Sequence, residues 1–454
     1  MIGDLVQSNV WPRYKAVVQA VSRAVASKVL RPGDRLPTQR ELADQLGWAV
    51  ATIGRAYSEL EALGVITSRV GSGTFVSSSG GTRESALKSG IDLATYKVPI
   101  PPTREALTRS IANLFAGEDL SLVLGASPAA GLSRHRETVA LWLGRQGVAI
   151  DPGQVIITNG GQHSTMSALS TLTHEGEALA TEELTDPRMK AVAAYLGRRL
   201  VPVTMDGDGM LPDALDHCCR TERPAAIYVT TRSQNPTTAT LPLERRVAIA
   251  DVARRYDLPI IESDIYGSLH DDPSPQIVSL APERTHHVGA FGRIAGPGMK
   301  VGWLVSPRHE VVRTQAGVGM STGSASLINV EIACGWVADG TMETLAQWQK
   351  AEVSRRLALL DRFPHLSTAR SEPRCAHIWM QLPDRWRAEE LVEQAALHDI
   401  AIAPTHSFLV GRGSTPHAVR LCIGSPADLG ELEAAAERIE RLLSTAPRVS
   451  MQTA

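Results

Sequence analysis

The sequence lacks the features that would place it in several large protein classes. It has only five cysteines among 454 residues, at irregular spacings, so a secreted disulfide scaffold is excluded and reduced thiols are expected. It has no apolar run long enough to span a membrane, and its first residues lack the apolar stretch of a signal peptide. These absences predict a cytoplasmic protein that has no membrane partner.

Strong net charge and nucleotide-binding motifs are also missing. The formal net charge of -2 excludes a globally basic nucleic-acid coat, although it says nothing about a local basic face. No Walker-type loop occurs, and no Gly-x-Gly-x-x-Gly follows an apolar run. Histidines and acids cluster at 270–272 and 286–287 without a repeated ligand spacing, so no metal site is expected. The length predicts two or three domains.

The first eighty residues carry helix signals followed by a hairpin. Apolar spacings of three and four predict a helix over 14–30, and Thr38 with Glu41 forms a capping box before a second helix that ends at Gly47. A third helix over 50–63 and two strand-like runs around Gly-Ser-Gly complete a winged helix-turn-helix. Residues 1–78 hold nine Lys/Arg against six Asp/Glu, a local positive charge that favours DNA binding.

This region resembles the winged helix of GntR-type regulators along the stretch LPTQRELADQLGWAVATIGRAYSELEALGVITSRVGSGTFV. The resemblance implies binding of double-stranded operator DNA, because its arginines and hydroxyls suit phosphates and its glycine wing lets the backbone approach closely. Ala49, Val50 and Gly54 depart from the family pattern, which bears on the operator sequence. The alternative is a winged helix that contacts protein. The implied DNA contacts are Arg40, Thr52, Arg55, Arg69, Gly71, Ser72, Gly73 and Thr74.

The remainder of the chain alternates strand-like apolar runs with helical segments. Runs at 155–160, 225–231 and 258–264 predict buried strands between helices, an alternation that is typical of an α/β domain with a mostly parallel sheet. Later strands over 374–383 and 417–426 predict a smaller α+β subdomain. The predicted boundaries are 10–78 for the α+β winged helix-turn-helix, 79–90 for a flexible linker, and 91–446 for the second domain, divided into 135–306 and 307–446.

Five segments of the second domain resemble motifs of fold-type I aminotransferases, in order and in spacing: TNGGQHS, SQNPTTATLP, IIESDIYGSL, GAFGRIAGPGMKVGW and AVRLCIG. A GntR-type winged helix joined to such a domain is typical of the MocR subfamily of bacterial transcription regulators, which the chain therefore resembles. The resemblance implies the aminotransferase fold and a homodimer. It also points to a site for pyridoxal phosphate (PLP), whose parts can be compared with this sequence.

Three parts of that PLP site differ from the family pattern. Arg293 stands where the Schiff-base lysine is expected, and a permanently protonated guanidinium is no amine nucleophile. Ser263 replaces the carboxylate that pairs with the pyridinium nitrogen, and the adjacent Asp264 is expected to point to the other face of its strand. Asp186 replaces the stacking aromatic. We therefore expect no bound cofactor, with non-covalent PLP binding as the alternative.

Other parts of the pocket remain. By resemblance, Asn235 and Tyr266 match residues that bond the ring hydroxyl, and Lys300 stands at the phosphate-binding position. Arg420 matches the arginine that grips a substrate carboxylate with a bidentate fork. A glycine turn before an expected helix offers a further anion site. The residues expected to bind a ligand in this degenerate pocket are Gly161, Gln162, Asn235, Tyr266, Arg293, Lys300 and Arg420.

Together these patterns predict a dimeric, DNA-binding transcriptional regulator that is not an enzyme and has no catalytic residues. Its aminotransferase-like domain is expected to respond to a small-molecule effector, either amino-acid-like or a carboxylate. One alternative is a PLP-binding regulator, or a PLP-dependent aminotransferase, that uses a different lysine. The other is a purely structural dimerisation domain without a ligand.

Overall fold

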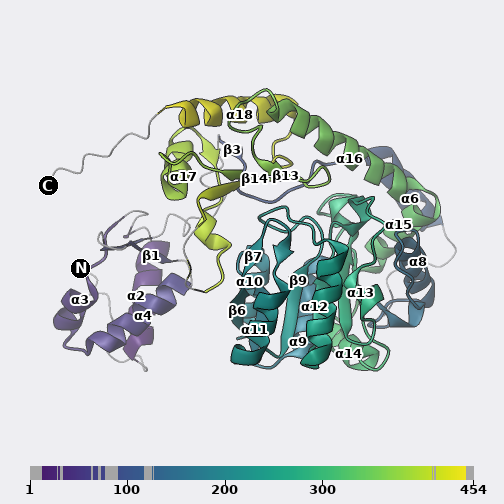
Figure 1. The fold of residues 1–454 in the computed structure, drawn as a ribbon, viewed down its shortest axis with the longest axis horizontal. Helices are drawn as coiled ribbons and strands as arrows, with labels where there is room; N and C mark the ends of the chain where they lie inside the picture. The colour runs from purple at the N-terminus through teal and green to yellow at the C-terminus, as the bar shows by residue number, and fades with distance from the viewer. Residues whose placement is uncertain are drawn as a thin grey trace. The chain divides into compact units, whose positions relative to one another are not determined.

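The computed structural model divides the chain into two compact units, Met1–Gly90 and Ile91–Ala454 (Figure 1). Each unit has its own hydrophobic core, and each is described by itself. The structure describes residues 13–27, 29–30, 34–62, 65–69, 73–76, 90–116, 125, 127–411, 413 and 416–445.

The first unit is a three-helix motif followed by a two-stranded hairpin. The second helix begins as the sequence predicts, because the Thr38 hydroxyl accepts the Glu41 N–H at 3.2 Å and the Glu41 carboxylate accepts the Thr38 N–H at 2.7 Å. It ends at Gly47, whose φ of 65° is left-handed. The elements are α2 (Arg13–Ala26), α3 (Gln39–Leu46), α4 (Val50–Ala62), β1 (Ile66–Arg69) and β2 (Gly73–Val76).

A small apolar core holds these elements together. Val17, Leu42, Ile53 and Leu60 come from all three helices and are fully buried in one cluster. Ile66 of β1 lies opposite Val76 of the antiparallel β2, and both join the same cluster. The predicted winged helix-turn-helix is confirmed.

The second unit is built on a seven-stranded sheet in the order β4-β12-β11-β10-β9-β5-β6. All neighbours in this sheet are parallel except β12, which is antiparallel to both β11 and β4. Most of its residues are buried, as expected for a sheet covered on both faces. The strands are β4 (Val155–Thr158), β5 (Ala178–Glu182), β6 (Arg199–Val203), β9 (Ala226–Thr230), β10 (Ile260–Ser263), β11 (Thr285–Ala290) and β12 (Gly302–Val305).

Alternate strand residues pack on opposite layers of helices. On β10, Ile260 joins the cluster of α11, α12 and α13, whereas Ile261 joins the cluster of α9 and α10. Figure 1 shows α11 and α12 alongside β6 and β9. The helices of this layered part are α8 (Ser133–Gly144), α9 (Gly161–Leu172), α10 (Pro187–Tyr195), α11 (Pro212–Glu222), α12 (Leu243–Arg255), α13 (Ile277–Leu280), α14 (Val311–Thr322) and α15 (Leu327–Ala338).

A smaller α+β part completes the second unit. Its antiparallel sheet has the order β13-β14-β16 and packs on α17 and α18 through a separate cluster that includes Ile378, Met380 and Val419. The long helix α16 contacts α15 at one side and α18 at the other (Figure 1). The bounds are α16 (Thr341–Leu360), β13 (Arg370–Ser371), β14 (Ile378–Gln381), α17 (Ala388–Leu397), β16 (Ala418–Leu421) and α18 (Leu429–Ser444).

Short elements link these parts. A parallel pair of two-residue strands joins the start of the unit to the small part, and α6 contacts α15. The predicted α/β domain with a smaller α+β subdomain is confirmed. Among the described residues, no helix is both long enough and apolar enough to cross a membrane. The linking elements are β3 (Ile91–Asp92), α6 (Arg104–Ala116), β7 (Met205–Asp206), β8 (Gly209–Met210), β15 (Ile400–Ala401) and the 3₁₀ turn η4 (Phe291–Arg293).

Candidate functional site

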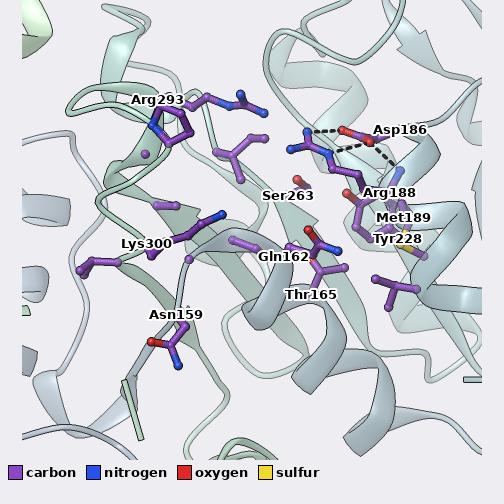
Figure 2. A pocket seen from close by; sticks show the side chains of 18 residues that line it. Asn159, Gln162, Thr165, Asp186, Arg188, Met189, Tyr228, Ser263, Arg293 and Lys300 are labelled. Atoms are coloured by element: carbon purple, nitrogen blue, oxygen red, sulfur yellow. Dashed lines mark hydrogen bonds and ion pairs between the residues drawn. The ribbon is translucent and has the colours of Figure 1, made fainter. Parts of the chain in front are cut away.

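A cavity of about 150 Å³ lies where the carboxyl ends of several sheet strands meet the first turn of α9. Open α/β sheets bind ligands at this edge, because the loops there can converge on a ligand. Figure 2 shows the polar side chains of this cavity converging from α9, α10, β10 and the segment between β11 and β12. The lining residues are Asn159, Gly160, Gly161, Gln162, Thr165, Asp186, Arg188, Met189, Val192, Tyr228, Ser263, Ile265, Ala290, Gly292, Arg293, Pro297, Lys300 and Val301.

The α9 wall depends on a close approach of two backbones. Gly160 has a φ of 90°, and a Cβ on Gly302 would lie 2.8 Å from the Gly160 backbone. Helix α9 begins at Gly161, so the N–H groups of its first turn have no partner within the helix. They present the positive end of the helix dipole to the cavity.

Arg293 forms the opposite wall, at the end of the turn that follows β11. Its guanidinium lies over the rings of Tyr96 and Tyr266, at 4.0 Å and 5.2 Å from their centroids. Burial lowers the pKa of Arg293 from its ordinary value, although an arginine stays charged at neutral pH. Among the described residues, no carboxylate forms an ion pair with it.

Lys300 supplies a second cation. Its side chain is exposed and extends toward the space between Arg293 and Gln162 (Figure 2). No carboxylate in the described part of the chain pairs with it. Its backbone has a positive φ of 49°.

Ser263 and Asp264 diverge at the end of β10. Ser263 lines the cavity because it lies on the same face of the strand as Ile261. Asp264 points away, as predicted, and its carboxylate accepts two hydrogen bonds from Arg232, with Nε at 2.9 Å, and one from His287 at 3.4 Å. Burial alone would raise the pKa of Asp264, but Arg232 and His287 lower it well below its usual value. This carboxylate is therefore already hydrogen-bonded in the protein interior and does not face the cavity.

A chain of polar contacts leads from the cavity to the smaller part of the unit. Arg188 donates from Nε and Nη2 to Asp186, at 3.1 Å and 2.6 Å, and its backbone N–H donates to the same carboxylate at 2.8 Å. Asn235 donates to Asp186 at 2.9 Å and accepts from Arg420 Nη1 at 2.9 Å. Burial favours a raised pKa for Asp186, but the charge and hydrogen bonds of Arg188, with Asn235, hold it well below its usual range.

The structure brings together four of the seven predicted ligand-binding residues. Gly161, Gln162, Arg293 and Lys300 line the cavity, whereas Asn235, Tyr266 and Arg420 do not. Arg420 is 4% exposed, lies over the Phe408 ring at 4.7 Å and donates to the Ala94 carbonyl at 2.5 Å.

Sequence reasoning missed Arg188 and Tyr96. The Asp-Pro-Arg run around Arg188 is typical of a helix N-terminus, and Asp186 is the N-cap of α10. Tyr96 comes from a segment without apolar periodicity, so no signal marked it.

The predicted DNA contacts all belong to the first unit. Arg40 on α3 and Arg55 on α4 are exposed, whereas Thr52 on α4 and Thr74 on β2 are half-buried. The Arg55 guanidinium lies 4.3 Å from the centroid of the Tyr14 ring. Arg69 and Gly73 are described as paired backbone positions in the hairpin, and Gly71 and Ser72 lie outside the described residues.

Both units match known families. The sequence profile of the gntR family of bacterial regulatory proteins matches residues 13–76, and the profile of aminotransferase class I and II matches residues 90–439. The uncharacterized HTH-type transcriptional regulator YdeF of Bacillus subtilis is 27% identical over 95% of this chain and 94% of its own length. The HTH-type pyridoxine biosynthesis transcriptional regulator PdxR of Corynebacterium glutamicum is 27% identical over 73% of this chain and 74% of its own.

Solved structures agree on the fold of the second unit. The structure of kynurenine aminotransferase from Pyrococcus horikoshii covers 80% of this chain and 92% of its own with a TM-score of 0.72. Its sequence identity of 20% limits this likeness to the fold. The chain therefore belongs to the aminotransferase class I and II family and, since a gntR-family domain precedes that domain, to the transcriptional regulators of MocR-type architecture.

Proposed function

We propose that this transcriptional regulator uses its aminotransferase-like unit as a non-catalytic sensor of a small anion. The observation that carries the proposal is Arg293. It follows β11, at the position where the aminotransferase motif that this segment resembles would have the Schiff-base lysine, and its guanidinium lies over the rings of Tyr96 and Tyr266. A guanidinium forms no aldimine at neutral pH, but it binds a carboxylate or phosphate well.

The donor set of the cavity does not fit the PLP of an aminotransferase. That cofactor needs an amine to bond with and a carboxylate at its ring nitrogen. The residue of β10 that faces the cavity is Ser263, and the nearby Asp264 is held by Arg232 and His287. The lining carboxylate, Asp186, is already shared by Arg188 and Asn235. No catalytic step is therefore assigned to these residues.

The test is titration of the purified protein with PLP, followed by its visible spectrum and by mass after borohydride reduction. We expect no aldimine absorbance band and no added mass. A mass adduct on one discrete lysine would overturn the non-catalytic assignment.

A second candidate is a PLP-binding regulator or aminotransferase that uses Lys300. It is favoured by one observation, that Lys300 lines the cavity without a paired carboxylate among the described residues. In the same experiment this second candidate predicts a mass adduct on Lys300 that is absent from the Lys300→Gln variant. Transaminase activity that disappears in that variant would establish it.

The regulator is proposed to act on DNA as a homodimer, because paired winged helices read paired half-sites. Helix α6 supports a dimer, since it has no buried residue and displays Leu107, Ile111 and Phe115, the last 64% exposed. Sedimentation of Phe115→Glu tests this, with Tyr195→Glu as control because Tyr195 is 79% exposed on α10. We expect a monomer only for the first variant. Dimers in both would exclude α6 from the interface.

The DNA-binding residues are proposed to be those predicted from the sequence, with Arg40 as the simplest test because it is exposed. Operator fragments selected from random DNA are bound by the full chain over a range of salt concentrations. Arg40→Ala is expected to weaken binding and to reduce the salt slope by about 1, as loss of one phosphate contact should. Arg308→Ala in the second unit is the control, because the Arg308 side chain is 78% exposed and lies outside α6. Equal binding by both variants would remove Arg40 from the interface.

Effector binding is proposed to reach the smaller part of the unit through Asp186, Asn235 and Arg420. These residues form continuous hydrogen bonds from the cavity to β16. A ligand that competes for Arg188 alters this chain, and it shifts operator binding if its affinity differs between two arrangements. Arg420→Ala should abolish the operator response to an effector, with Arg420→Lys as the milder variant. An unchanged response in both would refute the route.

A further inference from the structure

The cavity contains more positive than negative charge. Its charged lining residues are Arg188, Arg293, Lys300 and Asp186. The Asp186 carboxylate is bound bidentately by Arg188, which neutralises that pair. Arg293 and Lys300 are then two cations without a paired carboxylate among the residues that the structure describes.

The two unpaired cations stand at different places along the segment between β11 and β12. Figure 2 shows Arg293 at one side of the cavity and Lys300 beside the first turn of α9. The tyrosine faces around Arg293 stabilise its charge only in part, and burial still disfavours the charged form. A bound anion would replace the lost hydration with charge-assisted hydrogen bonds. Lys300 and the N–H groups at the start of α9 can likewise donate hydrogen bonds to a second anionic group.

The lining also disfavours an ammonium group. Its carboxylate, Asp186, already accepts from Arg188 and from Asn235. An amino group would meet two unpaired cations and no free carboxylate among the described lining residues, so it would be repelled. A carboxylate compound without an amine meets no such cost.

We propose that the ligand of this cavity is a small molecule with two anionic groups and no amino group, either a dicarboxylate or a phosphorylated carboxylate. One anionic group binds Arg293, and the other binds Lys300 with the first turn of α9. This inference rests on the proposed sensor function and narrows its ligand class. It excludes the amino-acid-like effector that the sequence alone left open.

The test is calorimetric titration of the full-length protein with matched probes. Glutarate is compared with butyrate, which lacks one carboxylate, and with glutamate, which adds an ammonium group. A second arm compares 3-phosphoglycerate with glycerol 3-phosphate and separates the phosphate from the carboxylate requirement. We expect glutarate or 3-phosphoglycerate to bind at least tenfold more tightly than its analogue with one anionic group and than glutamate.

Charge-removing variants locate the two subsites. Arg293→Gln and Lys300→Gln should each reduce the preference of glutarate over butyrate at least tenfold. Arg308→Gln is the control, because Arg308 is 78% exposed and pairs with Asp151 away from the cavity. An unchanged preference in either cavity variant would overturn the assignment of that subsite, and with it the proposal.

The outcomes separate this inference from the proposed function. Equal binding of glutarate and butyrate, or tighter binding of glutamate, would refute a ligand with two anionic groups and no amine while leaving an anion sensor in place. No binding of any probe at millimolar concentration would count against both. Fluorescence-monitored melting of each variant checks that it remains folded.

Discussion

Two arginine–aspartate pairs in the second unit have similar chemistry and opposite surroundings. Arg232 and Asp264 are 2% and 3% exposed, and His287 adds a third contact. Arg188 and Asp186 are 46% and 16% exposed, with Asn235 as the third contact and an open cavity beside them. The first pair is sealed, so its charges serve the fold. The second keeps solvent access, which leaves its arginine available to a ligand.

The energetic expectation follows from this difference. Removing one partner of a buried pair leaves a charge without compensation, which costs about 3–5 kcal/mol. A pair that keeps solvent access is less costly to break, because water can solvate the charge that remains. Identical substitutions at the two aspartates should therefore differ sharply in stability.

The largest effect is expected for Asp264→Asn, which leaves Arg232 buried beside a neutral amide. We expect the free energy of unfolding of the second unit to fall by about 3–5 kcal/mol. Urea unfolding followed by tryptophan fluorescence measures the change. The contrast between the two pairs would be contradicted if Asp264→Asn lowered the free energy of unfolding no more than Asp186→Asn does under the same conditions.

Glu182 shows what happens to a buried carboxylate without an arginine. It accepts the Thr230 N–H at 2.7 Å and the Thr181 hydroxyl at 3.0 Å, yet burial raises its pKa to about 7. Between its ordinary pKa and pH 7 the folded state binds more protons than the unfolded chain, so stability falls as pH rises through this window. The loss is about 3 kcal/mol above pH 7.

Glu182→Gln removes this loss while keeping the oxygen that accepts from Thr230. The variant should be more stable than the parent at pH 8 and indistinguishable from it near pH 4. Thermal melts across this range measure the difference, with Glu437→Gln on the exposed face of α18 as control. A parallel pH profile in parent and Glu182→Gln would argue against a buried, protonated Glu182.

Adding a methyl group at Gly267, beside the sealed pair of Arg232 and Asp264, should lower stability by a smaller amount. A Cβ on Gly267 would overlap the Asp264 carboxylate and would lie 2.5 Å from Arg232 Nη2. Gly267→Ala should therefore cost about 1–3 kcal/mol through overpacking. Gly161→Ala at the cavity is the matched variant, because the nearest atom to its Cβ would be Ile265 Cγ2 at 3.1 Å, with Ala290 and Val288 at 3.6 Å and 3.9 Å. Equal melting temperatures for the two variants would contradict a rigid sealed pair.

Much of the fold could be predicted because local signals agree with the final packing. The capping box at Thr38 and the left-handed Gly47 are set by neighbouring residues, and both occur where the sequence places them. Strand alternation likewise separates Ser263 from Asp264. These features depend on short stretches of chain and not on distant contacts.

The cavity was less predictable because its contacts join distant segments. Arg420 meets Asn235 across 185 residues, and this contact holds it outside the cavity lining. Arg188 turns back onto Asp186 and neutralises the carboxylate that stands in place of the stacking aromatic. Neither arrangement is visible in residue spacing, since both depend on how loops of different strands converge.

The smallest stability effect, and the sharpest test of the comparison, is Asp186→Asn. The asparagine keeps a cap for α10 and a partner for Asn235, and Arg188 keeps access to water, so we expect a smaller loss of stability than in Asp264→Asn. The substitution also removes the Asp186 carboxylate from the described cavity lining and frees Arg188 to bind an anion. Glutarate should then bind several-fold more tightly than it binds the parent, as measured by calorimetry. Weaker binding would mean that Asp186 holds Arg188 in the orientation that the ligand needs, so that this pair, too, serves as a scaffold.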